Sequence, residues 1–512
     1  MTHPPCAPRR IALAISVAFV VTPALAVENW HGEASLRVGE TWTDNVNLAP
    51  DARSDWITEI TPGVRFYGKG ARTDADVWAS WQNYLHADSE QDNNSSLLLN
   101  ARGRIEAIEK RVWVEANAGM TQQNTSMFGA QNTRGYNSDN NRSNVRTFSV
   151  SPYGTWHLGR DIDVQARYRY EYSDSDSEAL STQTTQSYDA SIANSTAWGK
   201  TGWGASINGE YSSDTNDATQ DVSNNSYRVW LSHMLSNTAT AQVFAGQERN
   251  NYQGADSVTT TNYGMGLDWA ISPTMSFSGD VSHRFFGTGY HLRLSKRWRM
   301  SSLEAGASRE VNNWSSSSTV NGYNFSPDFL ALDSALRASI PDATERSAEV
   351  LRQLAARGIT PYDLMQLSYL SSQYSLERRE YISGVLSGVR NKITLTVSHT
   401  NRRRLDESGV VSGGGDLAFF ESTDETSYNA TWSSRVTPVS TLFASINYSR
   451  ARGEGGTGDV DTASRRTTST ALTLDRKLSP QTDVLLSYRY TRQTGTGAYT
   501  ENVVAATLFH RF

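Results

Sequence analysis

Alternation of apolar and polar residues runs through almost the whole chain. In "DIDVQARYRYEY", residues 161–172, the even-numbered residues are apolar or aromatic and the odd-numbered residues are charged or polar. The same period of two recurs in "RVWVEANAGM" (111–120), "KITLTVS" (392–398) and "DVLLSYRYTR" (483–492). Successive side chains of a β-strand point to opposite faces, so this pattern predicts strands with one apolar and one polar face. The fold class is therefore all-β.

A soluble β-sandwich and a membrane β-barrel both produce such alternation, and two further features separate them. The apolar faces end in aromatic residues, as a lipid-facing band with aromatic girdles requires. Tight connections such as "GKGAR", "LGRD" and "ISPT" also alternate with long polar ones such as "NTSMFGAQNTRGYNSDNN". Short turns on one rim and long loops on the other are typical of outer-membrane barrels. The sequence predicts a transmembrane antiparallel β-barrel of about 22 strands over residues 27–512, located in the bacterial outer membrane.

The first residues predict export. A short basic start is followed by the apolar run "IALAISVAFVV" and by small residues at Ala24 and Ala26. This arrangement is typical of a signal peptide, residues 1–26, and the alternative is a membrane anchor. The one cysteine of the chain is Cys6, so we expect no disulfide in the barrel. The first strand begins close to the expected cleavage point, which argues against the plug domain of a TonB-dependent transporter.

Residues 326–372 interrupt the alternation. Ala348, Leu351 and Ala355 recur at helical spacing, and Gly358 suits a helix C-terminus. The sequence therefore predicts a short helical insert within one long loop. The insert could be a plug, a lid, a partner-binding element, or an external cap without a transport role, and we expect it in or over the lumen.

The period of two also assigns side chains to faces. We expect Tyr168, Val164, Leu486 and Ile393 to face lipid and Thr394 to face the lumen.

The candidate lumen-lining residues share a position on the polar faces of predicted strands. They are Asp163, Arg167, Arg169, Glu171, Arg293, Asp475 and Arg489. Rings of arginine in a pore favour anions or acidic sugars. The alternatives are ordinary ion pairing with neighbouring carboxylates such as Asp163, Glu171 and Asp475, and contacts of arginines at the rim with lipid phosphate.

We predict no enzymatic activity, cofactor or metal site. The histidines in the predicted strands, His233, His283 and His291, have no catalytic or metal-ligand spacing around them. A formal net charge of −6 also does not suggest a nucleic-acid partner. The expected partners are outer-membrane lipid, lipopolysaccharide and the barrel-assembly machinery.

Several stretches resemble one bacterial family, the outer-membrane β-barrel proteins associated with PEP-CTERM/exosortase systems. The matching stretches are "ETWTDNV", "SDWITEITPG", "GKGAR", "SVSPYGTWHLG" and "IPDATERSAEVLRQLAARG". The resemblance implies a pore or surface factor for exopolysaccharide export, with export components as partners. The alternatives are a general diffusion porin for small solutes and a structural or adhesive surface protein.

Phe512 ends a predicted aromatic strand and is the candidate assembly signal for the barrel-assembly machinery. We predict that deletion of Phe512 impairs assembly, because it removes the aromatic residue at the barrel rim. Heat-modifiable migration and membrane fractionation measure this directly. Normally inserted, heat-modifiable protein after the deletion would contradict the prediction.

Overall fold

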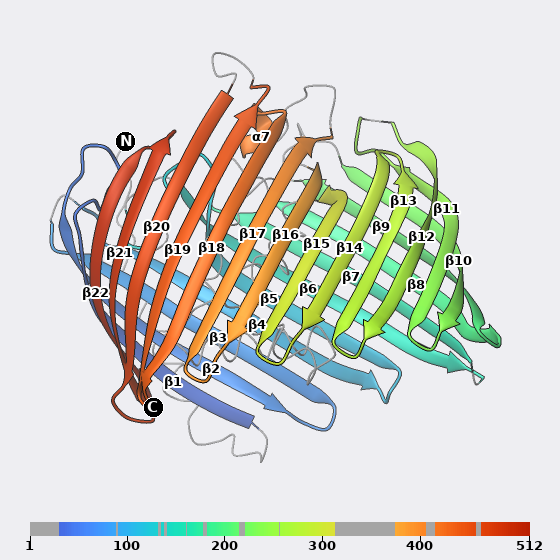
Figure 1. Ribbon diagram of the computed structural model, residues 1–512, viewed down its shortest axis with the longest axis horizontal. Helices are drawn as coiled ribbons and strands as arrows, with labels where there is room; N and C mark the ends of the chain where they lie inside the picture. The colour runs from blue at the N-terminus through green and yellow to red at the C-terminus, as the bar shows by residue number, and fades with distance from the viewer. Residues whose placement is uncertain are drawn as a thin grey trace, which may run out of the picture.

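The computed structural model shows a closed barrel of 22 antiparallel strands (Figure 1). The structure describes residues 30–88, 91–131, 135–137, 141–159, 161–177, 182–214, 221–254, 256–312, 374–405, 415–456 and 462–512. Sequential strands are neighbours throughout, and the last strand pairs with the first. The predicted fold class is therefore confirmed.

The first half of the barrel consists of β1 (Trp30–Thr43), β2 (Asp55–Lys69), β3 (Thr73–His86), β4 (Asn94–Ile108), β5 (Val112–Asn124), β6 (Arg142–Leu158), β7 (Ile162–Ser175), β8 (Gln183–Trp198), β9 (Thr201–Asp214), β10 (Val222–Ser236) and β11 (Ala239–Asn250). The second half consists of β12 (Val258–Ser272), β13 (Met275–Arg284), β14 (Gly287–Arg297), β15 (Ser301–Asn312), β16 (Ser375–Ser387), β17 (Asn391–Arg404), β18 (Ser422–Thr437), β19 (Ser440–Glu454), β20 (Thr462–Lys477), β21 (Thr482–Gly495) and β22 (Tyr499–Arg511). The number of strands is the one that the alternation and the turn signals predict.

β1 and β22 close the barrel. Their antiparallel register runs from Ser35 opposite Arg511 to Thr43 opposite Val503. The backbone N–H of Phe512 extends the ladder by donating to the carbonyl oxygen of Ala34 at 2.9 Å. Closure gives the edges of both strands a partner, as a β-structure in hydrocarbon requires.

The two rims carry connections of different length. The rim that holds the end of β22 has tight turns, for example Gly199–Lys200 between β8 and β9. The opposite rim carries the long connections, including residues 125–141 between β5 and β6. Two connections on that rim are short: Phe285 and Phe286 join β13 to β14, and residues 496–498 join β21 to β22. The predicted alternation of connection lengths is thus present, and it places the tight turns on the periplasmic side.

The outer surface is apolar and the inner surface is polar. Tyr168, Leu486 and Ile393 are exposed on the outside, at 42%, 50% and 36%, whereas Thr394 is buried toward the lumen at 5%. Val164 lies at the third position of β7, so it faces outward near the periplasmic rim rather than at mid-height. An apolar exterior around a polar interior fits a barrel with lipid outside.

The described residues contain one short helix, α7 (Asp416–Phe419), in the connection between β17 and β18. The sequence predicts only a polar loop there. The predicted signal peptide and the predicted helical insert at 326–372 lie outside the described residues. No helix within the described ranges is long and apolar enough to cross a membrane.

Two neighbouring residues near the middle of β11 test the assignment of faces. Val243 is 56% exposed on the outside, and Gln242 points inward opposite Gly266. We predict that Val243→Arg lowers the free energy of unfolding by about 2–4 kcal/mol, because it places a cation in hydrocarbon, and that Gln242→Arg lowers it far less. Reversible unfolding in lipid vesicles measures both values, and equal costs would contradict the assignment.

Candidate functional site

The lumen wall is rich in hydroxyl and amide side chains. Inward positions on neighbouring strands carry short polar residues that bond to one another, such as Ser383 Oγ with Thr396 Oγ1 at 3.1 Å. Further buried members of this wall are Ser80, Gln82, Ser96, Ser149, Ser151, Thr185, Ser212, Ser226, Ser282, Thr400, Ser427, Thr467 and Thr491. The inner face of the strands is therefore built largely from hydroxyl and amide side chains that bond to one another.

Three of the predicted lumenal arginines are ion-paired. Arg167 Nη1 lies 3.3 Å from Glu115 Oε2. Arg293 Nη2 lies 2.9 Å from Glu304 Oε1, and Arg489 Nη2 lies 3.2 Å from Glu501 Oε2. Sequence reasoning did not single out these three carboxylates. Two of them could have been found from the register: Arg489 is opposite Val503 and Arg293 is opposite Gly306, so each glutamate occupies the diagonal position.

The other predicted residues of the lumen have different surroundings. Asp163 lies at the periplasmic rim, where it contacts His157, and its side chain is 67% exposed. Glu171 is buried between Ser149 and Thr185 on the adjacent strands. Arg169 has no carboxylate within 4 Å among the described residues. Asp475 lies on the inner face of β20 near the periplasmic turn.

The seven predicted residues therefore form no single ring or cluster. Four lie along the inner face of β7, and the other three lie on β14, β20 and β21. Other inward ion pairs share the same chemistry, namely Arg65–Asp76, Arg104–Asp74, Arg102–Glu115, Arg284–Glu248, Arg402–Glu377 and Arg465–Glu425. Where described, most of the wall's arginines are compensated locally, which favours the ion-pairing alternative over an anion-selective ring.

The described residues of the β5–β6 connection, 125–131, 135–137 and 141, contact distant parts of the outer end of the barrel and are called the latch below. Its start contacts the β17–β18 connection: Ser126 Oγ and the Met127 backbone N–H both donate to the Asp416 carboxylate at 2.6 Å. The rings of Phe128 and Phe420 meet edge to face, with centroids 5.1 Å apart. A charge-assisted hydrogen-bond pair and an aromatic contact therefore hold this point.

The apolar contacts of this first anchor form a closed cluster. Met127 and Phe128 pack with Phe420, Ala451 and Ala463, and all five are at least nine-tenths buried. The two alanines come from β19 and β20, so the latch reaches the wall far from its own strands. The stretch "DLAFF" in an otherwise polar loop is the signal that could have revealed this contact.

A second anchor joins the latch to the barrel seam. Arg489 Nη2 donates to the Tyr136 hydroxyl at 3.1 Å, and Asn137 Nδ2 donates to Glu501 Oε1 at 3.1 Å. Tyr136 also packs in a buried cluster with Val46 and Tyr84. Because β22 closes on β1, the latch bridges from β5–β6 past β1–β4 to β19–β22.

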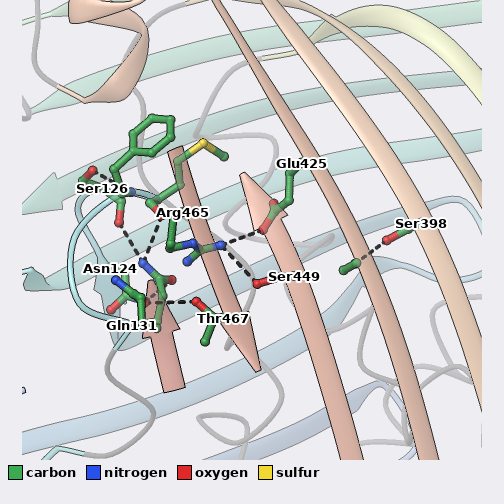
Figure 2. A network of polar contacts seen from close by, with 12 residues as sticks. Asn124, Ser126, Gln131, Ser398, Glu425, Ser449, Arg465 and Thr467 are labelled. Carbon is green, nitrogen blue, oxygen red and sulfur yellow. Dashed lines mark hydrogen bonds and ion pairs between the residues drawn. The ribbon is translucent and has the colours of Figure 1, made fainter. Parts of the chain in front are cut away.

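Polar contacts within the latch fix its own shape. Asn141 Nδ2 donates to the carbonyl oxygens of Ser126 and Ala130 at 2.9 Å, and Gln131 Nε2 donates to the carbonyl of Gly129 at 3.0 Å. Figure 2 shows Ser126, Asn124 and Gln131 lying beside Arg465 of the wall.

The latch lies over a buried ion pair. Arg465 Nη2 lies 3.3 Å from Glu425 Oε1 and donates to Ser449 Oγ at the same distance (Figure 2). The Arg465 side chain is only 2% exposed. Removal of one partner of such a pair leaves an uncompensated buried charge, so substitution of Arg465 or Glu425 alone should destabilise this part of the wall.

The Asp416 carboxyl adds a titratable group to the first anchor. It lies in α7, outside the membrane-spanning strands. Burial raises the pKa of Asp416 above its ordinary value of 3.8, while the hydrogen bonds from Ser126 and Met127 oppose the shift. Because the pKa is raised in the folded state, the protonated form stabilises the anchor below that value. This stabilisation is lost as pH rises through the raised pKa.

No three His, Cys, Asp or Glu side chains in the described ranges are placed to hold a metal ion.

Comparisons with known proteins reveal a likeness at the level of fold. No family model and no curated protein sequence matches the chain. The FrpB iron transporter from Neisseria meningitidis (F5-1 variant, apoprotein form) is similar, with 11% identity, a TM-score of 0.53, and coverage of 97% of this chain and 83% of that one. The siderophore receptor PirA from Acinetobacter baumannii has 8% identity and a TM-score of 0.50, and the match covers 94% and 80% of the two chains.

This likeness, the 22-strand closure and the apolar exterior agree. The chain is a bacterial outer-membrane β-barrel.

Loss of the Asp416 carboxylate should loosen the latch. Asp416→Ala leaves the Met127 N–H and the Ser126 hydroxyl without an acceptor, at a cost of about 1–3 kcal/mol. We predict at least a fivefold rise in the open fraction in planar-bilayer recordings. In the unmodified barrel the open fraction should also rise as pH increases through the raised pKa of Asp416, and the variant should lose this pH dependence.

Asp424→Ala is the matched control. Asp424 accepts a hydrogen bond from Asn401 at 2.9 Å and has no hydrogen bond or ion pair with a described residue of the latch. If the Asp416→Ala barrel had the same open fraction as the Asp424→Ala barrel, this result would contradict the role of Asp416 as an anchor of the latch.

Proposed function

We propose that this barrel is a restricted conduit for a hydroxyl-rich polymer, an exopolysaccharide, with the latch narrowing its outer mouth. The observation that carries the proposal is the chemistry of the lumen wall. Serine, threonine, asparagine and glutamine line it, and most of its arginines have a carboxylate partner. Such a wall can exchange hydrogen bonds with sugar hydroxyls along the whole path without one dominant binding site.

An aromatic ring on the inside supports a saccharide as cargo. Tyr381 faces the lumen and donates to Glu304 Oε1 at 2.8 Å. Tyr84 and Tyr136 meet edge to face near the mouth, but both are buried in the second anchor, so they offer no ring face to a cargo. Tyrosine combines an apolar ring face with a polar hydroxyl, which suits the apolar faces and hydroxyls of sugar rings.

The local pairing of charge argues against a strongly ion-selective porin. An unpaired arginine ring would attract anions, whereas the Arg–Glu pairs cancel each other within about 4 Å. A neutral or weakly charged polymer meets little electrostatic resistance on such a path. The sequence resemblance to exosortase-associated barrels implies the same class of cargo. The proposal assigns no catalysis to the chain.

Ferric-chelate uptake is the second candidate, and the fold likeness to FrpB and PirA favours it. Titration of the lumen with each cargo separates the two functions. We predict that neutral exopolysaccharide fragments reduce single-channel current through the Asp416→Ala barrel in a length-dependent manner, whereas ferric siderophores do not. Blockade by ferric siderophores alone would support the second candidate and contradict the first.

The charge balance gives an independent prediction. Glu304→Gln leaves Arg293 without its carboxylate, so the reversal potential in a salt gradient should shift toward anion selectivity. Glu109→Gln, on a periplasmic turn where the side chain is 63% exposed, is the control and should leave it unchanged. An unchanged reversal potential in both variants would show that the pair does not set the selectivity of the path.

A further inference from the structure

A groove runs along the outer, membrane-facing wall between β13 and β17. Its volume is about 430 Å³, within the range of small-ligand sites. The floor is formed by two small side chains of β15, Ala305 and Ala307. Bulkier apolar side chains of the flanking strands line the sides, namely Phe277, Leu292, Leu294, Ile382 and Val397.

Two arginines lie just beyond the outer end of this groove, at the next outward positions after Ala307 and Glu380. Arg309 of β15 and Arg378 of β16 are directly opposite each other in the ladder. Arg378 Nε lies 2.9 Å from Glu380 Oε1, and Arg309 Nη1 donates to the Thr288 carbonyl at 2.6 Å. Like charges directly opposite in a sheet repel each other. One carboxylate for two guanidinium groups leaves a net positive charge beside apolar surface.

Other polar groups near this end do not remove that charge. Tyr290 is opposite Arg309 on β14, and His399 lines the groove beside Glu380. The Asp424 carboxylate lies 3.8 Å from His399 Nε2 and is hydrogen-bonded to Asn401.

Another outward arginine at the same rim is compensated differently. Arg146 of β6 pairs with Asp174 at 2.7 Å and also contacts Asp176. Two carboxylates for one guanidinium leave no cationic site there. A second pair of outward arginines, Arg450 and Arg466, also face each other on β19 and β20, but the apolar groove is on the wall that carries Arg309 and Arg378.

The height of the wall places the two arginines at the outer headgroup level. β13, β14 and β15 have 10, 11 and 12 residues and are the shortest run of consecutive strands. Trp298, in the turn before β15, is 50% exposed and marks the inner interface. About 9–11 tilted residues span the hydrocarbon, so Arg309 lies where the headgroups of the outer leaflet begin.

We propose that this groove binds one molecule of the phosphorylated, acylated glycolipid of the outer leaflet. An acyl chain lies over Ala305 and Ala307 of β15, between Leu292 of β14 and Ile382 of β16. A phosphate lies against Arg309 and Arg378, because guanidinium groups pair with phosphate through charge-assisted hydrogen bonds. The inference is independent of the cargo of the lumen.

Native mass spectrometry of the purified full chain tests the proposal. The barrel is incubated with equimolar lipid A, dephosphorylated lipid A and phosphatidylethanolamine. We expect one retained lipid A per barrel in the unmodified protein. Arg309→Gln combined with Arg378→Gln should reduce its retention at least fivefold, and so should the groove-filling pair Ala305→Leu with Ala307→Leu.

Arg146→Gln is the matched control and should retain lipid A as the unmodified barrel does. Heat-modifiable migration confirms that each variant is folded. Undiminished retention in both double variants would overturn the proposal. Equal retention of dephosphorylated lipid A would overturn the phosphate contact, and retention of phosphatidylethanolamine alone would overturn the choice of ligand.

Discussion

Backbone hydrogen bonding in hydrocarbon is the constraint on which the rest of this structure depends. Lipid offers no partner for an open strand edge, so every spanning strand needs two neighbours. The pairing of β1 with β22 from Ser35 to Thr43 meets that requirement. Closure then fixes the alternation: outward side chains must be apolar, and inward side chains are free to be polar. The apolar content of the chain is low, 38%, because only the outward face of each strand has to be apolar.

Once the apolar residues face lipid, the interior must be organised by polar contacts. The lumen wall is organised by local Arg–Glu ion pairs and by hydrogen bonds between hydroxyl side chains of neighbouring strands. The latch is also held by hydrogen bonds to carboxylates. Its first anchor depends on Asp416 and its second on Glu501, a carboxylate that also pairs with Arg489. Apolar packing is confined to small clusters around Phe128 and Tyr136. The latch is therefore held by a few identifiable contacts, so we expect its position to be sensitive to single substitutions and to pH.

The sequence predicted the barrel closely, because alternation and turn length are local signals that hydrocarbon enforces on each strand. Tyr168, Leu486 and Thr394 face the sides that their parity predicts. The lumen was less predictable, since partners such as Glu304 and Glu501 depend on cross-strand register. The latch was not predicted at all: Met127 and Phe128 meet Phe420 across almost 300 residues of sequence, and no local pattern encodes that contact. The short helix α7 escaped prediction because four residues contain no helical period.

A reversible lock tests most directly whether the latch restricts the path. The chain's one cysteine is Cys6, so Ser126→Cys with Asp416→Cys in a Cys6→Ser background creates a single engineered pair at the first anchor. Single-channel current through this barrel should fall when the two cysteines are oxidised to a disulfide and recover when a reductant is added. The passage of neutral saccharide should fall and recover in the same way. Equal current and equal saccharide passage in the oxidised and reduced barrels, with the disulfide confirmed by mass, would contradict the account.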